Sequence, residues 1–450
     1  MIRRLLTHER GNQIIPAAFG VKHATAVLLY LPIWGSRGKS QDQSYKTREH
    51  RPVSQLLDQY PSIEDLRRRA RGRIPFFSWE YLDSGTGRDD GAARNTDAMR
   101  QVTLTPRFMR GRFEPETKTQ LFGQTYDAPF GVAPVGLTGL MWPEAENILA
   151  KAAGRFRIPY SLSTVATQAP ETIGPLAKGM GWFQLYPPRD PGIRRDLLAR
   201  AKAAGFTTLL VTADVPTGST RERQRRAGVT VPPRMTPLMI WRCAIRPWWS
   251  LSTLAAGTPR FRGIEKYVDG KDLQNMTAFI GRGLGGTLDW NYLEDVRKEW
   301  DGPIVIKGIM SVADTRDALS FGADGIGVSN HGARQCDGTP AAIEVLPRIA
   351  EIVDGRAPII FDSGIRTGLD IARAIALGAD FVLCGRAFMY GVAALGPRGG
   401  EQVAQLLLDD LKNNMSQLGC RTVQDLRDTP EDRGQPVLPA PAVGIAKEAI

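Results

Sequence analysis

The chain has 450 residues, of which 42% are hydrophobic, and it carries a formal net charge of +11. This length allows one large α/β barrel or two to three smaller domains, and the apolar content excludes a disordered or fibrous protein. The positive charge is concentrated before Arg73 and between Arg221 and Arg246, but no nucleic-acid-binding motif accompanies it, so we expect no nucleic-acid partner. The four cysteines show neither metal-ligand spacing nor a disulfide framework, which predicts no metal site and a reducing compartment.

The chain begins with a segment, residues 1–55, that we predict to be a disordered extension. Its apolar run, residues 24–34, is too short to span a bilayer, so an unstructured extension is favoured over a weak export signal or surface anchor. A helix is expected to start at Ser62, which supplies the cap, with Glu64 and Asp65 in its first turn. A second segment, residues 76–82, leads into a turn at residues 83–87.

From residue 130 onward, short apolar or β-branched runs alternate with helix-like stretches. Eight runs are expected to be strands, at residues 130–135, 160–164, 182–186, 208–212, 304–307, 325–329, 359–362 and 381–384. Helices are expected between most of them, at residues 144–156, 193–204, 312–321, 341–352 and 369–377. Several end in glycine, at Gly205, Gly322 and Gly378, as helices do when the residue after them turns left-handed.

This alternation predicts an α/β fold, a closed parallel (β/α)8 TIM barrel, over residues 56–428, preceded by N-terminal helices and followed by a tail at residues 429–450. A helix pair through residues 402–418 is expected to close the barrel. A doubly wound open sheet is the alternative. It is disfavoured because no G-x-G-x-x-G sequence follows the first strand, and because a barrel gathers polar strand ends at one mouth whereas an open sheet scatters them.

One connection is too long for the barrel pattern. Nearly ninety residues separate Asp214 from Ile304, where a crossover needs roughly a dozen, which indicates an insert at about residues 217–290 after strand 4. The insert carries basic and aromatic residues, namely Arg221, Arg223, Arg225, Arg226, Trp241, Arg242, Arg246, Trp248 and Trp249. Such interleaving suits a bilayer interface and predicts peripheral membrane contact. The alternative is a lid on the barrel mouth with its tryptophans buried.

The most informative stretch follows the sixth expected strand, at residues 329–338. His331 is the only histidine after residue 50, and Arg334 stands three residues further on. A neutral imidazole can accept a proton, and a guanidinium can grip a carboxylate with two parallel hydrogen bonds. The pair predicts proton abstraction from a small organic acid. A turn whose histidine merely caps a backbone group is the alternative.

Polar residues also follow the other strands, where barrel enzymes place their sites. They are Ser163, Thr164, Gln184, Tyr186, Thr212, Asp214, Lys307, Ser329, Asp362, Gly385 and Arg386. Glycine and arginine in residues 362–368 and 384–386 predict a bound phosphate after the seventh and eighth strands, although ordinary turn chemistry also uses such glycines. Lys307 points into the mouth, where it could neutralise charge on a cofactor or form a Schiff base, so an aldolase is a rival interpretation.

Taken together, these motifs resemble the family of FMN-dependent L-2-hydroxy acid dehydrogenases and oxidases. The resemblance covers roughly residues 62–421 and rests on residues 182–186, 211–216, 306–308, 329–338, 362–366 and 385–386. Residues 133–137, 162–165 and 300–303, and the long basic insert, are most similar to the branch of bacterial respiratory L-lactate dehydrogenases. Mandelate dehydrogenase and glycolate oxidase are also similar.

The resemblance implies a role for each site residue. His331 would remove a proton while hydride passes to flavin N5, and Asp214 would stabilise the resulting imidazolium. Arg221 and Arg334 would bind the substrate carboxylate, and Tyr81 and Tyr186 would hold substrate oxygens. The FMN would be held by Ser163, Gln184, Thr212, Lys307, Ser329, Asp362, Gly364, Arg366, Gly385 and Arg386.

Five positions bear on how far the resemblance holds. Ala333 and Cys336 replace a commoner glycine and leucine in the histidine motif, and Gln224 replaces a usual aspartate. Val165 stands where the plant oxidase has a large aromatic residue, and Gly136 is expected to face the same region. The two small residues suggest room for a side chain larger than that of glycolate.

We therefore predict an enzyme that uses FMN to oxidise an L-2-hydroxy acid, most simply L-lactate, to the 2-oxo acid. Electrons are expected to pass to a quinone or a cytochrome, with the protein peripheral on the cytoplasmic face of the inner membrane. An oxidase that makes hydrogen peroxide and a mandelate dehydrogenase are the alternatives within the family, and a non-catalytic flavin-binding protein is the alternative outside it. A homo-oligomer, by analogy a tetramer, is expected.

Overall fold

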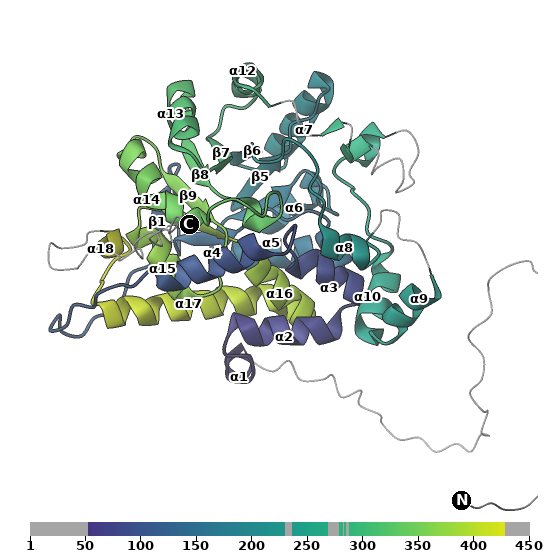
Figure 1. The fold of residues 1–450 in the computed structure, drawn as a ribbon, viewed down its shortest axis with the longest axis horizontal. Helices are drawn as coiled ribbons and strands as arrows, with labels where there is room; N and C mark the ends of the chain where they lie inside the picture. Colours follow the sequence, from purple (N-terminus) through teal and green to yellow (C-terminus); the bar gives the residue numbers. More distant parts are fainter. Residues whose placement is uncertain (1–52, 230–235, 269–278, 282, 285–287, 428–450) are drawn as a thin grey trace, which may run out of the picture. The chain divides into compact units, whose positions relative to one another are not determined.

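Eight parallel strands close into a barrel in the computed structural model of the chain (Figure 1). Consecutive strands pair in parallel, and β10 pairs with β3 to complete the ring. The strands are β3 (Phe130–Val132), β4 (Tyr160–Ser163), β5 (Gly181–Leu185), β6 (Thr208–Thr212), β7 (Ile304–Ile309), β8 (Gly325–Val328), β9 (Ile359–Asp362) and β10 (Phe381–Cys384). The predicted (β/α)8 barrel is therefore confirmed, and the open-sheet alternative is wrong.

The structure describes residues 53–229, 236–268, 279–281, 283–284 and 288–427. The predicted extension up to residue 52 and the predicted tail at residues 429–450 lie outside the described residues. Helix α1 (Val53–Gln59) opens the described part of the chain.

Local sequence signals explain where the helices begin and end. Ser62 caps α2 (Ile63–Arg73), since its hydroxyl accepts from the Asp65 N–H at 3.2 Å and the Asp65 carboxylate accepts from the Ser62 N–H at 3.1 Å. Helix α13 (Val312–Phe321) ends at Gly322, whose φ of 83° is left-handed, as predicted. The other barrel helices are α5 (Ala145–Phe156), α6 (Pro170–Ala177), α7 (Pro191–Ala203), α12 (Trp290–Glu299), α14 (Ala342–Val353), α15 (Gly368–Ala376) and α16 (Arg386–Leu395).

Further helices pack outside this ring. Helix α17 (Gly399–Leu418) lies across α5, α15 and α16, and α2 lies along α16 (Figure 1). The short α18 (Gln424–Arg427) contacts α15. The predicted segment at residues 76–82 is α3 (Phe76–Asp83), whereas α4 (Asp90–Gln101) and α6 were not predicted.

The amino-terminal end of the barrel is filled by aromatic side chains. Strands β1 (Thr119–Leu121) and β2 (Gln124–Tyr126) form an antiparallel hairpin, which was not predicted. Its Tyr126 ring lies 6.1 Å from that of Trp182 and 5.5 Å from that of Phe381, and its hydroxyl accepts from Trp182 Nε1 at 3.0 Å. Because this end is packed, the open space lies at the opposite end, where the strands finish.

The insert after β6 both covers the barrel mouth and projects from it. Helix α8 (Glu222–Arg226) lies against α3, and α9 (Pro237–Ala244) packs on α10 (Pro247–Ala256). After the 3-10 turn η2 (Glu265–Tyr267), the chain returns to the mouth, where the Arg189 N–H donates to the Gly283 carbonyl at 2.9 Å. The insert therefore contributes to the space above the strands.

The three tryptophans of the insert divide between its two faces. Trp249 is buried against Phe77, with ring centroids 5.6 Å apart, and its Nε1 donates to the Met141 carbonyl at 3.1 Å. Trp241 and Trp248 are 63% and 60% exposed. The alternative of a lid with buried tryptophans therefore fits Trp249 but not Trp241 or Trp248. Within the described ranges no helix is long and apolar enough to cross a membrane.

Candidate active site

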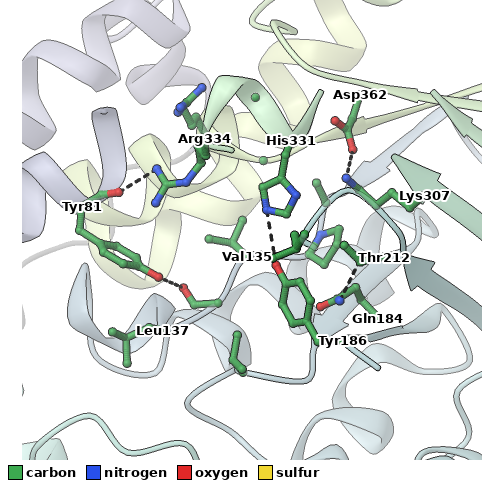
Figure 2. A pocket seen from close by; sticks show the side chains of 18 of the residues that line it. Tyr81, Val135, Leu137, Gln184, Tyr186, Thr212, Lys307, His331, Arg334 and Asp362 are labelled. Atoms are coloured by element: carbon green, nitrogen blue, oxygen red, sulfur yellow. Dashed lines mark hydrogen bonds and ion pairs between the residues drawn. The ribbon is translucent and has the colours of Figure 1, made fainter. Parts of the chain in front are cut away.

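A cavity of about 540 Å³ opens at the carboxyl ends of the strands (Figure 2). This volume lies in the range of about 300–1,000 Å³ that small-molecule and cofactor sites occupy. Most predicted site residues line it, namely Tyr81, Gln184, Tyr186, Thr212, Arg221, Lys307, His331, Arg334, Asp362, Gly364, Arg366, Gly385 and Arg386. Ser163, Asp214 and Ser329 do not line it but lie directly behind residues that do.

His331 and Asp214 form a partly buried imidazole–carboxylate pair. The Nδ1 atom of His331 lies 3.0 Å from Asp214 Oδ1, and Nε2 faces the cavity, 3.4 Å from the Tyr186 hydroxyl. Burial alone would raise the pKa of Asp214, but the charge and hydrogen bond of His331 and the charge of Lys307 hold it below its usual range. An ionised carboxylate fixes the ring orientation and stabilises a proton gained at Nε2.

The backbone around His331 is held in an uncommon conformation. His331, Gly332 and Ala333 have φ values of 56°, 62° and 58°, all left-handed. The Ser329 hydroxyl accepts from the His331 N–H at 3.0 Å, and the Asn330 side-chain oxygen accepts from the Ala333 N–H at 3.2 Å. These bonds offset the strain of the two non-glycine residues and aim the imidazole into the cavity.

Lys307 lies at the floor of the cavity in a buried polar cluster. Its Nζ donates to Ser329 Oγ at 2.9 Å and lies 2.8 Å from Asp362 Oδ2, while Ser329 Oγ donates to Asp362 Oδ1 at 2.6 Å. Burial would lower the pKa of Lys307, but the charges of Asp362 and Asp214 raise it above its ordinary value. A Schiff base requires the neutral amine, so the aldolase interpretation does not fit this lysine.

A chain of neutral polar side chains runs along the adjacent strands. Ser163 Oγ donates to Gln184 Oε1 at 2.8 Å, and Gln184 Nε2 donates to Thr212 Oγ1 at 2.9 Å. The three come from β4, β5 and β6: the strand register pairs Ser163 with Gln184, and Thr212 lies two residues beyond Leu210, the partner of Gln184 on β6. Such a row offers donors and acceptors to the polar edge of a flat ring.

Three arginines bring unmatched positive charge to the cavity. Arg334 Nη1 donates to the Tyr81 and Ser84 carbonyls at 3.0 and 2.8 Å, and Arg386 Nη2 donates to the Ser84 carbonyl at 2.9 Å. Arg221 contacts Ser219 and Gln335. Among the described residues, none of the three has a carboxylate within ion-pair distance. Burial, with the charges of Arg221 and Arg386, lowers the pKa of Arg334. An anion bound beside Arg334 would therefore stabilise its charged guanidinium.

The predicted phosphate loops lie together at one end of the cavity. Gly385 precedes α16 and leaves the first turn of this ten-residue helix without a side-chain cap. Arg366 and Gly364 approach from the loop after β9. Helix N–H groups beside two arginines form a favourable site for a phosphate.

The other end of the cavity is apolar. The Tyr81 hydroxyl donates to the Gly136 carbonyl at 3.1 Å, and a Cβ atom on Gly136 would lie 2.6 Å from Val165 Cγ2. The sequence predicts that these two small residues lie in the same region, and both line the cavity. It did not find the remaining wall, which the insert supplies through Phe261, Ile280, Gly281 and Leu284. Only the length of the insert hinted that it could reach the mouth.

The residues present fit FMN. The polar row suits the edge of its ring system, Lys307 suits negative charge on that ring, and the uncapped start of α16 with Arg366 and Arg386 suits its phosphate. His331, Arg221 and Arg334 line the same cavity and suit a small acid. The fold and site thus define a barrel enzyme that takes a phosphate-bearing cofactor and an organic acid.

Comparisons with known proteins agree. The FMN-dependent dehydrogenase family matches residues 70–431, and the chain belongs to that family. An L-lactate dehydrogenase of Vibrio parahaemolyticus is 39% identical over 80% of this chain and 96% of that protein. An L-lactate dehydrogenase of Xanthomonas axonopodis pv. citri is 40% identical over 81% of this chain and 94% of that protein.

Solved structures show the same relationship. The monotopic membrane protein (S)-mandelate dehydrogenase matches with a TM-score of 0.77 and 31% identity, covering 81% of this chain and 97% of that one. A mandelate oxidase matches with a TM-score of 0.70 and 33% identity, covering 82% and 97%. The chain is an FMN-dependent oxidoreductase.

Proposed function

We propose that the protein uses FMN to oxidise an L-2-hydroxy acid to the 2-oxo acid, with L-lactate as the preferred substrate. The observation that carries this proposal is the His331–Asp214 pair, which faces the same cavity as two arginines without carboxylate partners. L-Lactate is supported by the relatives of that name, which this chain matches over most of their length.

The side chains divide the work by position. Arg221 and Arg334 bind the substrate carboxylate, and the hydroxyls of Tyr81 and Tyr186 hold its oxygens. His331 accepts the hydroxyl proton at Nε2, and Asp214 stabilises the imidazolium through Nδ1. When bound, FMN supplies the acceptor for the hydride equivalent that leaves the substrate carbon.

The remaining residues hold the cofactor. Lys307 keeps its positive charge beside Asp362 and Ser329 and would offset negative charge on the flavin ring. Gln184 and Thr212 would hold the ring edge, and Ser163 would support them from behind through its bond to Gln184. The ribityl chain and phosphate are bound by Asp362, Gly364, Arg366, Gly385 and Arg386.

The electron acceptor in this proposal is a membrane quinone or a cytochrome. Its support is the exposed apolar face of α9 and α10, which carries Leu238, Ile240, Trp241, Ile245, Trp248, Leu251 and Leu254. A patch of this kind marks a protein or membrane contact. We propose that it lies on the cytoplasmic face of the inner membrane. The homotetramer remains a prediction.

A second candidate substrate is an aromatic hydroxy acid such as mandelate. The apolar wall formed by Val165, Phe261, Ile280 and Leu284 favours it, since this wall suits a larger side chain than a methyl group.

The test is anaerobic stopped-flow absorbance of the purified protein mixed in turn with L-lactate, L-mandelate and glycolate. Fast bleaching of the oxidised flavin band by L-lactate supports the proposal, and faster bleaching by L-mandelate selects the second candidate. Oxygen is then readmitted to the reduced enzyme. If oxygen reoxidises the flavin as fast as a quinone analogue does, the enzyme is an oxidase and not a dehydrogenase. If the purified protein is yellow but none of the hydroxy acids bleaches its flavin band, it is a non-catalytic flavin-binding protein.

A further inference from the structure

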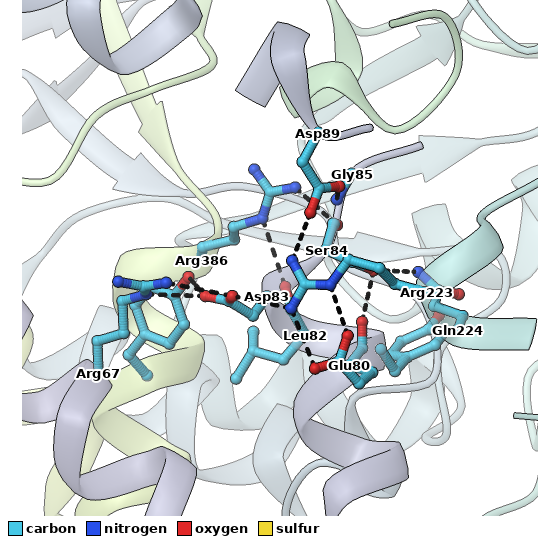
Figure 3. Close-up of polar contacts among 12 residues, drawn as sticks. Arg67, Glu80, Leu82, Asp83, Ser84, Gly85, Asp89, Arg223, Gln224 and Arg386 are labelled. Atoms are coloured by element: carbon cyan, nitrogen blue, oxygen red, sulfur yellow. Dashed lines mark hydrogen bonds and ion pairs between the residues drawn. The ribbon is translucent and has the colours of Figure 1, made fainter. Parts of the chain in front are cut away.

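Arg223 ties the first helix of the insert to a helix that borders the cavity (Figure 3). Its Nε and Nη2 atoms donate to the two carboxylate oxygens of Glu80 at 2.6 and 3.0 Å. Nη1 donates to Asp89, and Nη2 lies 3.5 Å from Asp83 Oδ2. One guanidinium on α8 therefore contacts three carboxylates on α3 and in the turn that follows it.

On the α3 side, these carboxylates adjoin residues that form the cavity. Glu80 is 6% exposed and immediately precedes Tyr81, whose ring and carbonyl contact Arg334. Asp83 immediately precedes Ser84, whose carbonyl accepts from both Arg334 and Arg386. A shift of this end of α3 would displace both walls of the carboxylate-binding region.

On the α8 side, Arg223 stands two residues after Arg221. Arg221 precedes the first turn of α8 with a left-handed φ of 43°, which a non-glycine residue keeps only when its surroundings hold it there. Three more contacts cross the same interface: the Arg221 N–H donates to Thr86 Oγ1 at 3.3 Å, the Gly87 N–H donates to Glu222 Oε2 at 2.7 Å, and Gln224 Nε2 donates to Ser84 Oγ at 3.1 Å. Arg223 makes the most extensive of these contacts.

Gln224, on the same helix, stands where an aspartate is more usual in the family that the sequence resembles. It is 5% exposed and its amide donates to a hydroxyl, which needs no counter-charge. The ionic part of the interface therefore rests on Arg223 alone among the residues of α8. Burial would lower the pKa of Arg223, but Glu80 and Asp89 raise it, so the guanidinium stays charged.

We propose that Arg223 is a positioning residue for substrate binding: by clamping α8 to α3 through Glu80, Asp83 and Asp89, it fixes Arg221 opposite Tyr81 and Arg334. This inference rests on the proposed role of Arg221 as a ligand of the substrate carboxylate. It assigns to a charged residue of the insert a function in the cavity and not at a lipid surface. Misplacing a binding group by about 1 Å can cost on the order of 100-fold in rate.

The test compares Arg223→Met with a matched control in the holoenzyme. The control is Arg194→Met. Arg194 also makes a bidentate pair, since its Nε and Nη2 atoms each donate to a carboxylate oxygen of Glu299 at 2.8 Å. This pair joins α7 to α12 away from the cavity. We expect Arg223→Met to raise KM for L-lactate at least about tenfold, with kcat within about threefold of wild type and FMN retained. Arg194→Met should lower Tm and leave KM unchanged. Equal KM values for the two variants would overturn the proposal.

A double-mutant cycle separates this inference from the proposed function. If Arg223 acts through Arg221, then Arg223→Met should raise KM far less in an Arg221→Met background than in wild type. Full additivity would overturn the positioning role. An Arg221→Met variant with unchanged KM would instead refute the proposed ligand. If Arg223→Met does not fold, Glu80→Gln keeps the side-chain shape and removes the charge, and the same KM increase is expected.

Discussion

The Nδ1 atom of His331 lies 3.0 Å from Asp214 Oδ1, so its Nε2 atom is left to face the cavity beside Tyr186. The hydrogen bond decides which nitrogen is available to a substrate. Asp214 Oδ2 has no hydrogen-bond partner among the described residues. The carboxylate is thus committed to the imidazole, which is the arrangement expected of a base and its orienting group.

His331→Gln should abolish this chemistry while leaving the cavity intact. Glutamine fills a similar volume but cannot accept the proton, and positioned bases contribute about 10²–10⁴-fold to rate. We expect kcat with L-lactate to fall by at least about 10²-fold with a normal flavin spectrum. A nearly active variant in anaerobic flavin-reduction assays would show that another group takes the proton.

The lowered pKa of Asp214 predicts a pH-dependent contribution to stability. Its ordinary value is about 3.9, and the folded-state value is lower. The ionised form therefore stabilises the fold above the ordinary value, and this contribution disappears as the pH falls through the folded-state pKa. Asp214→Asn should lower Tm at pH 7, with a deficit that shrinks below about pH 4. Thermal unfolding followed by circular dichroism at pH 7, 5 and 3 measures it; a constant deficit would contradict the electrostatic origin.

The buried pair of Lys307 and Asp362 predicts that stability and activity can be separated. Lys307→Met leaves a buried carboxylate without its cation, which costs about 3–5 kcal/mol, whereas removing both charges is often nearly neutral. We expect Lys307→Met to lower Tm strongly and Lys307→Met/Asp362→Asn to recover most of the loss. In neither variant should L-lactate reduce the flavin. Recovered turnover in the double variant would show that the lysine charge is dispensable.

The barrel could be predicted because its signals are local. Each strand is a short apolar run, each helix has its own apolar spacing, and capping residues such as Ser62 and Gly322 mark the ends. The site followed from the barrel, because parallel strands bring Gln184, Lys307 and His331 to one mouth without any need for long-range information.

What the sequence did not predict depends on pairing between distant segments. The sequence pattern places Arg223 among the basic residues predicted to face lipid, yet its partner Glu80 lies 143 residues earlier in the chain, and nothing in either local pattern points to the other. The same holds for Phe261, which becomes a cavity wall only because the insert returns to the mouth. The β1–β2 hairpin was missed because three-residue strands are too short to show alternation.

The split orientation of the insert tryptophans gives a test of membrane contact with an internal control. Trp241 and Trp248 are exposed on the α9–α10 pair, whereas Trp249 packs on Phe77. Trp241→Ser/Trp248→Ser should weaken binding to vesicles of anionic phospholipid at least about tenfold, because at least about 1.4 kcal/mol of apolar burial is lost. The Tm of this double variant and its rate of flavin reduction should equal those of the wild type.

Trp249→Ser should behave in the opposite way. It removes a buried ring and leaves the Met141 carbonyl without its donor, so Tm should fall by several degrees while the exposed face is unchanged. Vesicle binding is measured by co-sedimentation at equal protein concentration. Unchanged binding of the Trp241→Ser/Trp248→Ser variant would exclude the exposed rings as the lipid contact and leave a protein partner, such as a cytochrome, as the occupant of this face.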